Sequence, residues 1–566
     1  MKVKKKSVSE WVKSGDPWVW LNAGAVAISV IMVVGLLLLI AVRGLGHFWP
    51  ADVVEARYEL PGQPAYKLIG ERVESVEVPV AQLREAGINI PGDFDLMQRT
   101  LIKTGNRDVY GTDFRWVLDE YVTESKRPEM LFTAERHEWG NLYGYLKSVK
   151  ENGQIVAETA DYEPTESALA TWEVFQKSIE RADKIHQEIK KIEKKDIGKI
   201  NYGLERIRLK QRSLELKGEL TPAAEADLTV ERSQYDEEYK VLQQSLIDLY
   251  AQINRDSFTV EAMDGSVQEI GVAKIVHAYR ANAMGVGEKI GFYFVKLWEF
   301  LSDEPREANT EGGVFPAIFG TVMMVFLMTI LVTPFGVVAA VYLREYASQG
   351  WLTRTIRIAV NNLAGVPSIV YGVFGLGFFI YFLGSSIDQA FFPEALPSPT
   401  FGTGGLMWAS VTLALLTLPV VIVATEEGLA RIPRNVREGS LALGATKAET
   451  LWRVVLPMAS PAIMTGVILA VARAAGEVAP LMLVGVVKLA PSLPLDGNYP
   501  YIHLDQKFMH LGFHIYDVGF QSPNVEAARP LVYATALLLV IVIALLNFSA
   551  VTIRNHLREK YKSLEM

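Results

Sequence analysis

The sequence predicts an all-α polytopic membrane protein with six transmembrane helices and an inserted extracytoplasmic α+β domain that contains a long helical hairpin. Half of the 566 residues are hydrophobic, yet 21% are charged, a mixture typical of membrane helices joined to a separate soluble part. Apolar runs long enough to span a membrane occur near the N-terminus and in the second half of the chain, but not between. We therefore divide the chain into residues 1–43, 44–312 and 313–566.

Residues 1–43 are expected to hold the cytoplasmic N-terminus and the first transmembrane helix. An apolar run extends from Trp18 to Val42. The basic residues before this run are Lys2, Lys4, Lys5, Lys6 and Lys13. A signal peptide also begins with basic residues, but this run is longer than the apolar core of a signal peptide and has no cleavage motif of small residues. The sequence thus predicts an uncleaved helix that enters the membrane from the cytoplasm.

The segment between the first and second spans is predicted to form a small β domain that carries the helical hairpin. Short alternating runs such as Tyr143–Val149 indicate strands. From about 165 to 256, apolar residues recur at helical spacing among many charges, and Gly218–Pro222 interrupts them, which predicts two long antiparallel helices. These helices are either a spacer or a surface for docking or sensing. Residues 257–278 are expected to return to the β domain as a hairpin with its turn at Asp264-Gly265.

Five further spans and the distribution of basic residues predict the topology. The spans are expected at Phe315–Leu343, Ile358–Leu383, Leu406–Thr425, Pro461–Val487 and Leu531–Ile553. Lys and Arg are frequent at both termini and in the loops after the second and fourth spans, whereas residues 384–405 contain neither. Because basic loops stay on the cytoplasmic side, both termini and the loop between the fourth and fifth spans are expected there. The protein is thus predicted in the inner (cytoplasmic) membrane, with residues 44–312 outside.

Composition argues against several other classes of function. The formal net charge of -8 disfavours nucleic-acid binding. The chain has no cysteine, which excludes disulfides, thiolate metal sites and cysteine nucleophiles. It also lacks the G-x-x-x-x-G-K-[ST] motif that cradles ATP phosphates, so energy from ATP would have to come through a partner. We expect a protein that performs no bond chemistry and has no catalytic residue, no cofactor and no metal site.

The loop at 427–460 carries the most specific motif in the chain. Its pattern is E-[small]-[small]-x3-G-x9-[aliphatic]-x-L-P. The residues concerned, with one further small residue, are Glu438, Gly439, Ser440, Ala442, Gly444, Val454, Leu456 and Pro457. Small side chains let a partner approach the backbone closely, glycine permits a sharp turn between two short helices, and Pro457 is expected to end the second one. The motif resembles the coupling loop of ABC-importer permeases, which implies docking of an ATPase; an ordinary amphipathic loop is the alternative.

Two other stretches resemble the phosphate-importing ABC transporter permeases of the PstA type, in a variant with a large extracytoplasmic insertion. They are Asn362–Phe379 (NLAGVPSIVYGVFGLGFF) and Ala472–Met482 (ARAAGEVAPLM). The segments Gly313–Tyr342 and Phe508–Phe520 fit the same family, and the resemblance extends from Gly312 to the C-terminus. It implies pairing with a second homologous permease subunit, two ABC ATPase subunits inside and an extracytoplasmic phosphate-binding protein outside.

The resemblance also implies that Arg473 and Glu477 are the charged residues of the translocation path. Both are expected at mid-membrane depth, one helical turn apart, where ionisable groups are costly unless they pair or line a water-filled route. A guanidinium can bind two phosphate oxygens at once. A carboxylate can accept the proton of hydrogen phosphate, which sulfate lacks. The alternative is a purely structural salt bridge. Ser368, beside Pro367, either donates to the oxyanion or marks a packing kink.

The predicted function is inward passage of inorganic phosphate, driven by ATP hydrolysis on partner subunits. A close alternative is a permease for another oxyanion, such as molybdate or sulfate. An alternative from another class is a membrane-anchored sensor or scaffold whose external helices bind a partner. A scaffold has no need of a loop that engages an ATPase, so the motif at 427–460 disfavours it.

Overall fold

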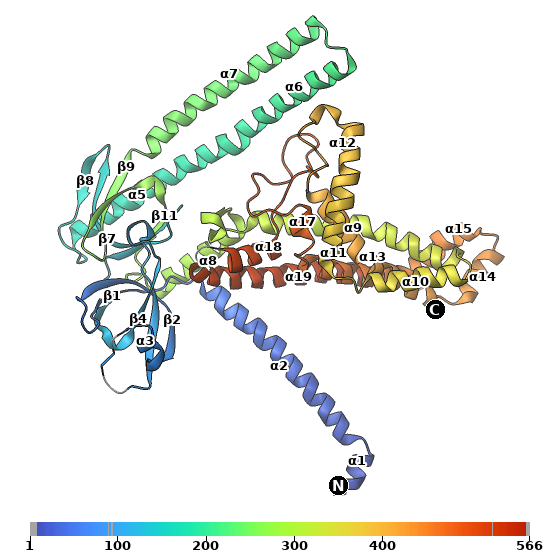
Figure 1. The fold of residues 1–566 in the computed structure, drawn as a ribbon, viewed down its shortest axis with the longest axis horizontal. Coiled ribbons are helices and arrows are strands. Elements are labelled where there is room, and N and C mark those ends of the chain that lie inside the picture. The colour runs from blue at the N-terminus through green and yellow to red at the C-terminus, as the bar shows by residue number, and fades with distance from the viewer. Residues whose placement is uncertain (1–7, 89, 92–93, 523–524, 562–566) are drawn as a thin grey trace.

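The computed structural model describes residues 8–88, 90–91, 94–522 and 525–561. Within these residues six helical segments are long and apolar enough to cross a membrane (Figure 1), which confirms the predicted number. The six segments are Asp16–Gly46, Phe315–Tyr346, Ser368–Phe391, Leu406–Arg431, Lys447–Gly476 and Ala528–Lys560. Five lysines used to predict the orientation lie outside the described residues, namely Lys2, Lys4, Lys5, Lys6 and Lys562.

The fourth span, α13 (Leu406–Arg431), forms the centre of the membrane part. It packs against α9 (Phe315–Val341) on one side and α16 (Leu456–Gly476) on the other. The last span, α19 (Val525–Tyr561), lies against α16 and, near its start, against the first span, α2 (Asp16–Gly46). Apolar residues from α9, α13 and α16 are buried together in one core because each of these helices has neighbours on several sides.

The third and fifth spans differ from their predicted bounds. The predicted third span, Ile358–Leu383, is interrupted: α10 (Trp351–Leu363) ends before Gly365 and Pro367, and a new helix begins at Ser368. The fifth span ends at Gly476 rather than at Val487. A hydropathy pattern does not reveal either interruption, because most residues within them are apolar or small. Proline and glycine, however, disfavour continuation of the helix.

The rest of the membrane part consists of shorter helical segments. The continuation of the third span is α11 (Ser368–Phe374), the π-helical turn η6 (Gly375–Gly384) and α12 (Ser385–Phe391). The others are α1 (Val8–Lys13), η5 (Tyr342–Tyr346), η7 (Pro393–Ala395), α14 (Arg434–Ala442), α15 (Lys447–Thr450), η8 (Leu451–Val455), α17 (Leu481–Val484), α18 (Leu511–Tyr516) and η9 (Asp517–Gln521).

The segment between α2 and α9 contains two antiparallel sheets. The first has the order β4-β3-β2-β1-β5, and the second has the order β10-β9-β7-β6-β11 with β8 paired to β7. The first sheet comprises β1 (Val53–Tyr58), β2 (Tyr66–Pro79), β3 (Leu96–Lys103), β4 (Phe114–Leu118) and β5 (Val122–Lys126). The second comprises β6 (Leu131–Arg136), β7 (Leu142–Glu151), β8 (Gln154–Glu158), β9 (Asp256–Glu261), β10 (Val267–Gly271) and β11 (Ile275–Tyr279). The predicted strands and the turn at Asp264-Gly265 are thus confirmed.

Short elements complete the same segment. They are α3 (Val80–Glu85), α4 (Arg107–Tyr110), η1 (Asp119–Tyr121), η3 (Val272–Lys274), α8 (Val286–Ser302), η4 (Glu307–Asn309), and the two-residue strands β12 (Pro305–Arg306) and β13 (Glu311–Gly312). The helix α8 leads from β11 to the start of α9, so it connects the sheets to the second span.

The predicted helical hairpin is present and is inserted between β8 and β9. Its first arm runs from Glu166 to Lys217 through α5 (Glu166–Lys191), the π-helical turn η2 (Ile192–Asp196) and α6 (Ile197–Lys217). At 1.5 Å per residue this arm is roughly 75 Å long. The second arm is α7 (Pro222–Ile253). The turn between them forms because Gly218 adopts φ +69° and the Thr221 hydroxyl caps α7.

The hairpin leans over the loops of the membrane part. The start of α5 packs on the second sheet, where Phe175 meets Phe132 and Phe258. Farther along, α6 lies against η7, and the Tyr202 hydroxyl donates a hydrogen bond to the Tyr499 carbonyl. Figure 1 shows the hairpin extending from the sheets above the ends of the membrane helices. The arms are therefore attached at their base and also touch two loops of the membrane part.

Candidate translocation path and coupling loop

Two helix interruptions meet inside the membrane part. One separates α10 from α11, and the other separates α16 from α17. A Cβ atom added at Gly372 on α11 would lie 2.7 Å from Cα of Pro480, which belongs to the second interruption. Only a glycine permits this approach. Non-helical backbone at membrane depth is tolerated where protein or a water-filled cavity surrounds it, so this meeting point is a natural site for a polar solute.

Arg473 and Glu477 flank the second interruption. The Arg473 Nε atom lies 3.6 Å from Glu477 Oε1, and the two side chains are 31% and 21% exposed. The prediction that both residues lie on one helix is wrong, because α16 ends at Gly476 and Glu477 has extended backbone angles, φ −82° and ψ 129°. Glycine is a weak helix former, and Pro480 disfavours helical geometry in the residue before it. Arg473 and Glu477 are nevertheless in contact, although the helix ends between them.

Ser368 is the first residue of α11, at the first interruption. It follows Pro367, which occupies the N-cap position and begins the helix. Ser368 is half-buried, and no residue that the structure describes forms a hydrogen bond with its hydroxyl. Because Ser368 precedes Gly372 by four residues, both lie on the face of α11 that approaches Pro480. The first interruption therefore presents a free hydroxyl and the N–H groups of a helix start.

Tyr371 was not among the predicted site residues. Its side chain is buried, and its hydroxyl donates a 2.6 Å hydrogen bond to the carbonyl of Leu363, the last residue of α10. This bond ties the two sides of the first interruption together. The stretch P-S-I-V-Y could have predicted this bond, because a tyrosine three residues after a helix start projects back toward the preceding segment.

The loop between the fourth and fifth spans forms two short helices joined by a tight turn. Gly444 has φ +88°, as predicted for the turn between α14 and α15. Thr446 caps α15 and exchanges hydrogen bonds with Glu449, while Ser440 and Thr450 join the two helices through a 2.9 Å contact between their hydroxyls. The loop is thus held in one shape by its own polar side chains.

Arg437 and Lys447 hold this loop against the end of the second span. Arg437 forms a 2.9 Å ion pair with Glu345 and donates to the carbonyls of Leu429 and Ile432. Lys447 donates to the Glu345 carbonyl. A force applied to the loop would therefore reach α9 as well as α13 and α16. Near the end of α13, Glu426 forms an ion pair with Arg357 at 3.1 Å.

The predicted coupling residues divide into two groups. Glu438, Gly439, Ala442 and Gly444 are exposed, and Ser440 is half-buried. The second group, Val454, Leu456 and Pro457, is half-buried on the continuous helical segment that returns to the membrane.

The prediction that Pro457 ends the second short helix is wrong. Pro457 lies at the start of α16, directly after the π-helical turn η8, and both belong to one continuous helical segment, Lys447–Gly476.

Two exposed apolar side chains of the loop were also not predicted. Leu443 is 92% exposed and Trp452 is 72% exposed. Apolar side chains with this exposure on an ordered loop are typical of a protein–protein contact. The sequence contains the signal in Leu443, which directly precedes the turn glycine, but only the fold shows that neither side chain packs inward.

Comparisons with known proteins agree with this arrangement. Residues 332–563 match the family described as binding-protein-dependent transport system inner membrane component. The phosphate transport system permease protein PstA 1 of Mycobacterium tuberculosis (strain CDC 1551 / Oshkosh) is 37% identical over 247 residues, which cover 43% of this chain and 71% of that protein. The phosphate transport system permease protein PstA of Yersinia pestis is 31% identical over 252 residues, covering 44% and 75%.

Among solved structures, an inward-facing methionine ABC transporter, MetNI, aligns with a TM-score of 0.32 and 21% identity, covering 48% of this chain and 99% of that chain. The aligned region covers more than two thirds of the length of each of these two sequence relatives, at over 30% identity. The chain therefore belongs to the family of inner-membrane permease components of binding-protein-dependent ABC importers, in which ATP hydrolysis resides in a separate subunit.

Proposed function

We propose that this permease passes inorganic phosphate inward along a path that includes Arg473, Glu477 and Ser368. The observation that carries the proposal is the meeting of two helix interruptions beside an accessible guanidinium. A guanidinium, a hydroxyl and the start of a helix are each suited to an oxyanion. The names of the relatives in Mycobacterium tuberculosis and Yersinia pestis, both phosphate permeases, support phosphate as the anion.

The proposal includes an orientation. The basic residues that the structure describes at both ends of the chain and in the loop 427–460 are on one side of the membrane by the positive-inside rule, which assigns that side to the cytoplasm. Residues 44–312 are then extracytoplasmic. ATPase subunits dock on the loop through Glu438, Gly439, Ala442, Leu443 and Trp452, while the second group, Val454, Leu456 and Pro457, transmits their movement to α16.

Two further partners belong to the proposed assembly. A second homologous permease subunit closes the path on the side that this chain leaves open. A phosphate-binding protein delivers the anion from outside, consistent with the description of the family as binding-protein-dependent. The hairpin that touches Tyr499 and η7 lies beside the loops where such a protein would dock.

The test is uptake of radiolabelled phosphate by vesicles that contain the assembled transporter, with ATP inside and sulfate or molybdate as competitor. The expected result is ATP-dependent uptake that excess phosphate suppresses and excess sulfate or molybdate does not. Competition by sulfate or molybdate at the same concentration as phosphate would favour the alternative oxyanion permease. Absence of any ATP-dependent uptake, in vesicles whose ATPase subunits hydrolyse ATP, would contradict transport of phosphate.

A further inference from the structure

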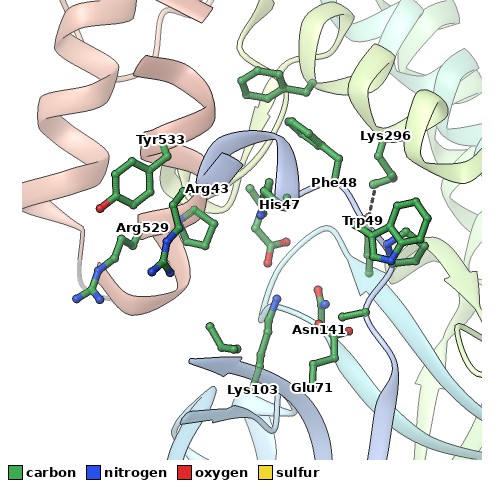
Figure 2. A pocket seen from close by; sticks show the side chains of 18 of the residues that line it. Arg43, His47, Phe48, Trp49, Glu71, Lys103, Asn141, Lys296, Arg529 and Tyr533 are labelled. Atoms are coloured by element: carbon green, nitrogen blue, oxygen red, sulfur yellow. Dashed lines mark hydrogen bonds and ion pairs between the residues drawn. The ribbon is translucent and has the colours of Figure 1, made fainter. Parts of the chain in front are cut away.

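A cavity of about 400 Å³ lies where the sheets meet the membrane helices (Figure 2). Its membrane side consists of the last turns of α2 and the first turns of α19. Its opposite side consists of β2, β3 and α8. The path residues and the coupling residues do not line it. The cavity is therefore separate from the proposed route of the transported anion.

The cavity lies at the apex of a wedge between two spans. A Cβ atom added at Gly44 of α2 would lie 2.8 Å from the Ala534 nitrogen of α19, so the two helices touch closely there. Away from this contact α2 diverges from the other spans, and its apolar side chains are exposed (Figure 1). Both helices end or begin beside the cavity, which places it at the depth of lipid headgroups.

Three cations from three separate segments converge on this cavity. Figure 2 shows Arg43 of α2 beside Arg529 of α19, and Lys103 of β3 extending toward the same opening. Arg529 lies 3.5 Å from Glu74, a pair in which the two side chains are 55% and 31% exposed. Among the described residues none forms a hydrogen bond or ion pair with the side chain of Arg43 or Lys103. Arg43 and Lys103 therefore have charged groups available to an anion that enters the cavity.

Six carboxylates also line the cavity, namely Glu71, Glu74, Glu135, Glu299, Asp303 and Glu311. Glu135 and Glu299 are held by Lys296 at 2.5 and 2.8 Å. Burial raises the pKa of Glu71 and of Glu311, and the nearby charge of Lys103 opposes this rise. The Glu71 Oε1 atom is buried and has no hydrogen-bond partner among the described residues. It is an acceptor available to a ligand that carries an N–H or O–H group.

We propose that this cavity binds a phosphate group, held by Arg43, Lys103 and Arg529, with Glu71 accepting a hydrogen bond from a donor on the same ligand. Two sources share this chemistry. One is the headgroup of a phospholipid such as phosphatidylethanolamine, whose acyl chains would lie in the wedge between α2 and α19. The other is free hydrogen phosphate. The position of the cavity at the end of two spans favours the lipid.

The test measures both sources on the assembled transporter in detergent. One arm titrates phosphatidylethanolamine and reads bound lipid by native mass spectrometry; the other titrates radiolabelled inorganic phosphate and reads bound counts. The variant Arg43→Gln with Lys103→Gln is expected to weaken binding in one arm by roughly tenfold or more, because it loses two hydrogen bonds between charged groups. Loss in the first arm identifies a lipid, and loss in the second identifies free phosphate.

Two controls keep the result interpretable. Arg57→Gln removes an arginine from β1 that is outside the cavity and about half exposed, and it is expected to bind both ligands like the wild type. Arg43→Lys with Lys103→Arg keeps both charges and is expected to bind the ligand more tightly than the Gln variant does. Wild-type binding by the Gln variant in both arms would overturn the proposal. So would a charge-retaining variant that elutes as an intact complex but binds as weakly as the Gln variant.

Discussion

Arg473 and Glu477 lie where α16 gives way to extended chain. At 3.6 Å the contact between Arg473 Nε and Glu477 Oε1 is longer than a strong charge-assisted hydrogen bond. Among the described residues none accepts a hydrogen bond from the two terminal nitrogens of this guanidinium. Under the proposed function these donors are available to an oxyanion, and Glu477 reduces the free energy of placing the Arg473 charge within the membrane.

The role of Glu477 can be tested by replacement with glutamine. If the carboxylate accepts the proton of hydrogen phosphate and repels fully ionised sulfate, Glu477→Gln will let sulfate compete for phosphate uptake roughly tenfold better than in the wild type. The measurement is the concentration of sulfate that halves phosphate uptake by vesicles. Unchanged competition by sulfate, with phosphate uptake retained, would show that Glu477 does not select the anion.

A second residue-scale prediction concerns the ion pair between Glu135 of β6 and Lys296 of α8, which joins the sheets to the helix leading into the second span. Burial opposes ionisation of Glu135, but the charges of Lys296, His277 and Arg306 outweigh it and lower the pKa of Glu135 from 4.5 to about 2. Because the pKa is lower in the folded protein, this stabilisation is present above about pH 4.5 and is lost as the pH falls toward 2.

Lys296→Met should therefore lower the thermal unfolding temperature of the complex at pH 7. It leaves a buried carboxylate without its nearest counter-ion, a change that costs about 3–5 kcal/mol in comparable buried pairs. The matched control is Lys177→Met, which removes a lysine paired with Glu173 on the exposed face of α5 and should change the unfolding temperature little. An equal effect of the two substitutions would contradict the structural role of the buried pair.

At the scale of elements, the apolar spans were predictable and their interruptions were not. A span needs only a run of apolar residues, so each of the six was found. The interruption before Ser368 depends on how α11 packs: Gly372 and Gly375 let it approach Pro480 and Thr412, and these contacts are far apart in sequence. Pro457 does not end the helix, because it directly follows the π-helical turn η8 within one continuous helical segment, Lys447–Gly476.

The loop 427–460 was predictable because its glycine and capping residues act locally. Its exposed surface was not, since exposure of Leu443 and Trp452 depends on what the fold leaves uncovered. The path residues show the same difference. Arg473 and Glu477 are in contact, as their spacing suggested, although the helix ends between them. The bond from Tyr371 to Leu363 was found only from the structure.

Leu443→Asp provides a test of the coupling loop. It places a charge at this exposed apolar position and is expected to reduce the amount of ATPase subunit that co-purifies by roughly tenfold or more, as expected for an apolar residue at the centre of an interface. The control Leu216→Asp introduces the same charge at an exposed leucine of α6 and should leave co-purification unchanged. Normal co-purification of the ATPase with Leu443→Asp would show that the ATPase docks elsewhere than at Leu443.

At the scale of the whole molecule, the hairpin shows what long-range contacts add. Its two helices and their turn follow from local patterns, so they were predictable. Its position above the membrane part depends on contacts such as Tyr202 with Tyr499, which join residues almost three hundred positions apart. An arm of roughly 75 Å that rests on those loops lies close to any protein that approaches the path from the same side.

The absence of cysteine makes the proposed orientation directly testable, since a single introduced cysteine is the only thiol in the chain. Ser233→Cys on α7 and Ala448→Cys on α15 both replace exposed residues. A membrane-impermeant maleimide is expected to label Ser233→Cys in intact cells, and to label Ala448→Cys only after the cells are opened. The reverse pattern would invert the topology and place the coupling loop outside, where no ATPase could reach it.

In the proposed mechanism phosphate moves past the Arg473 guanidinium, driven by ATP that a partner subunit hydrolyses. The most direct measurement compares phosphate uptake and ATP hydrolysis in vesicles containing the assembled transporter, with Arg473→Ala beside the control Arg212→Ala, an exposed arginine on α6. The account predicts that Arg473→Ala loses phosphate uptake by tenfold or more while the ATPase subunits remain bound, and that Arg212→Ala transports like the wild type. Wild-type uptake by Arg473→Ala would contradict it.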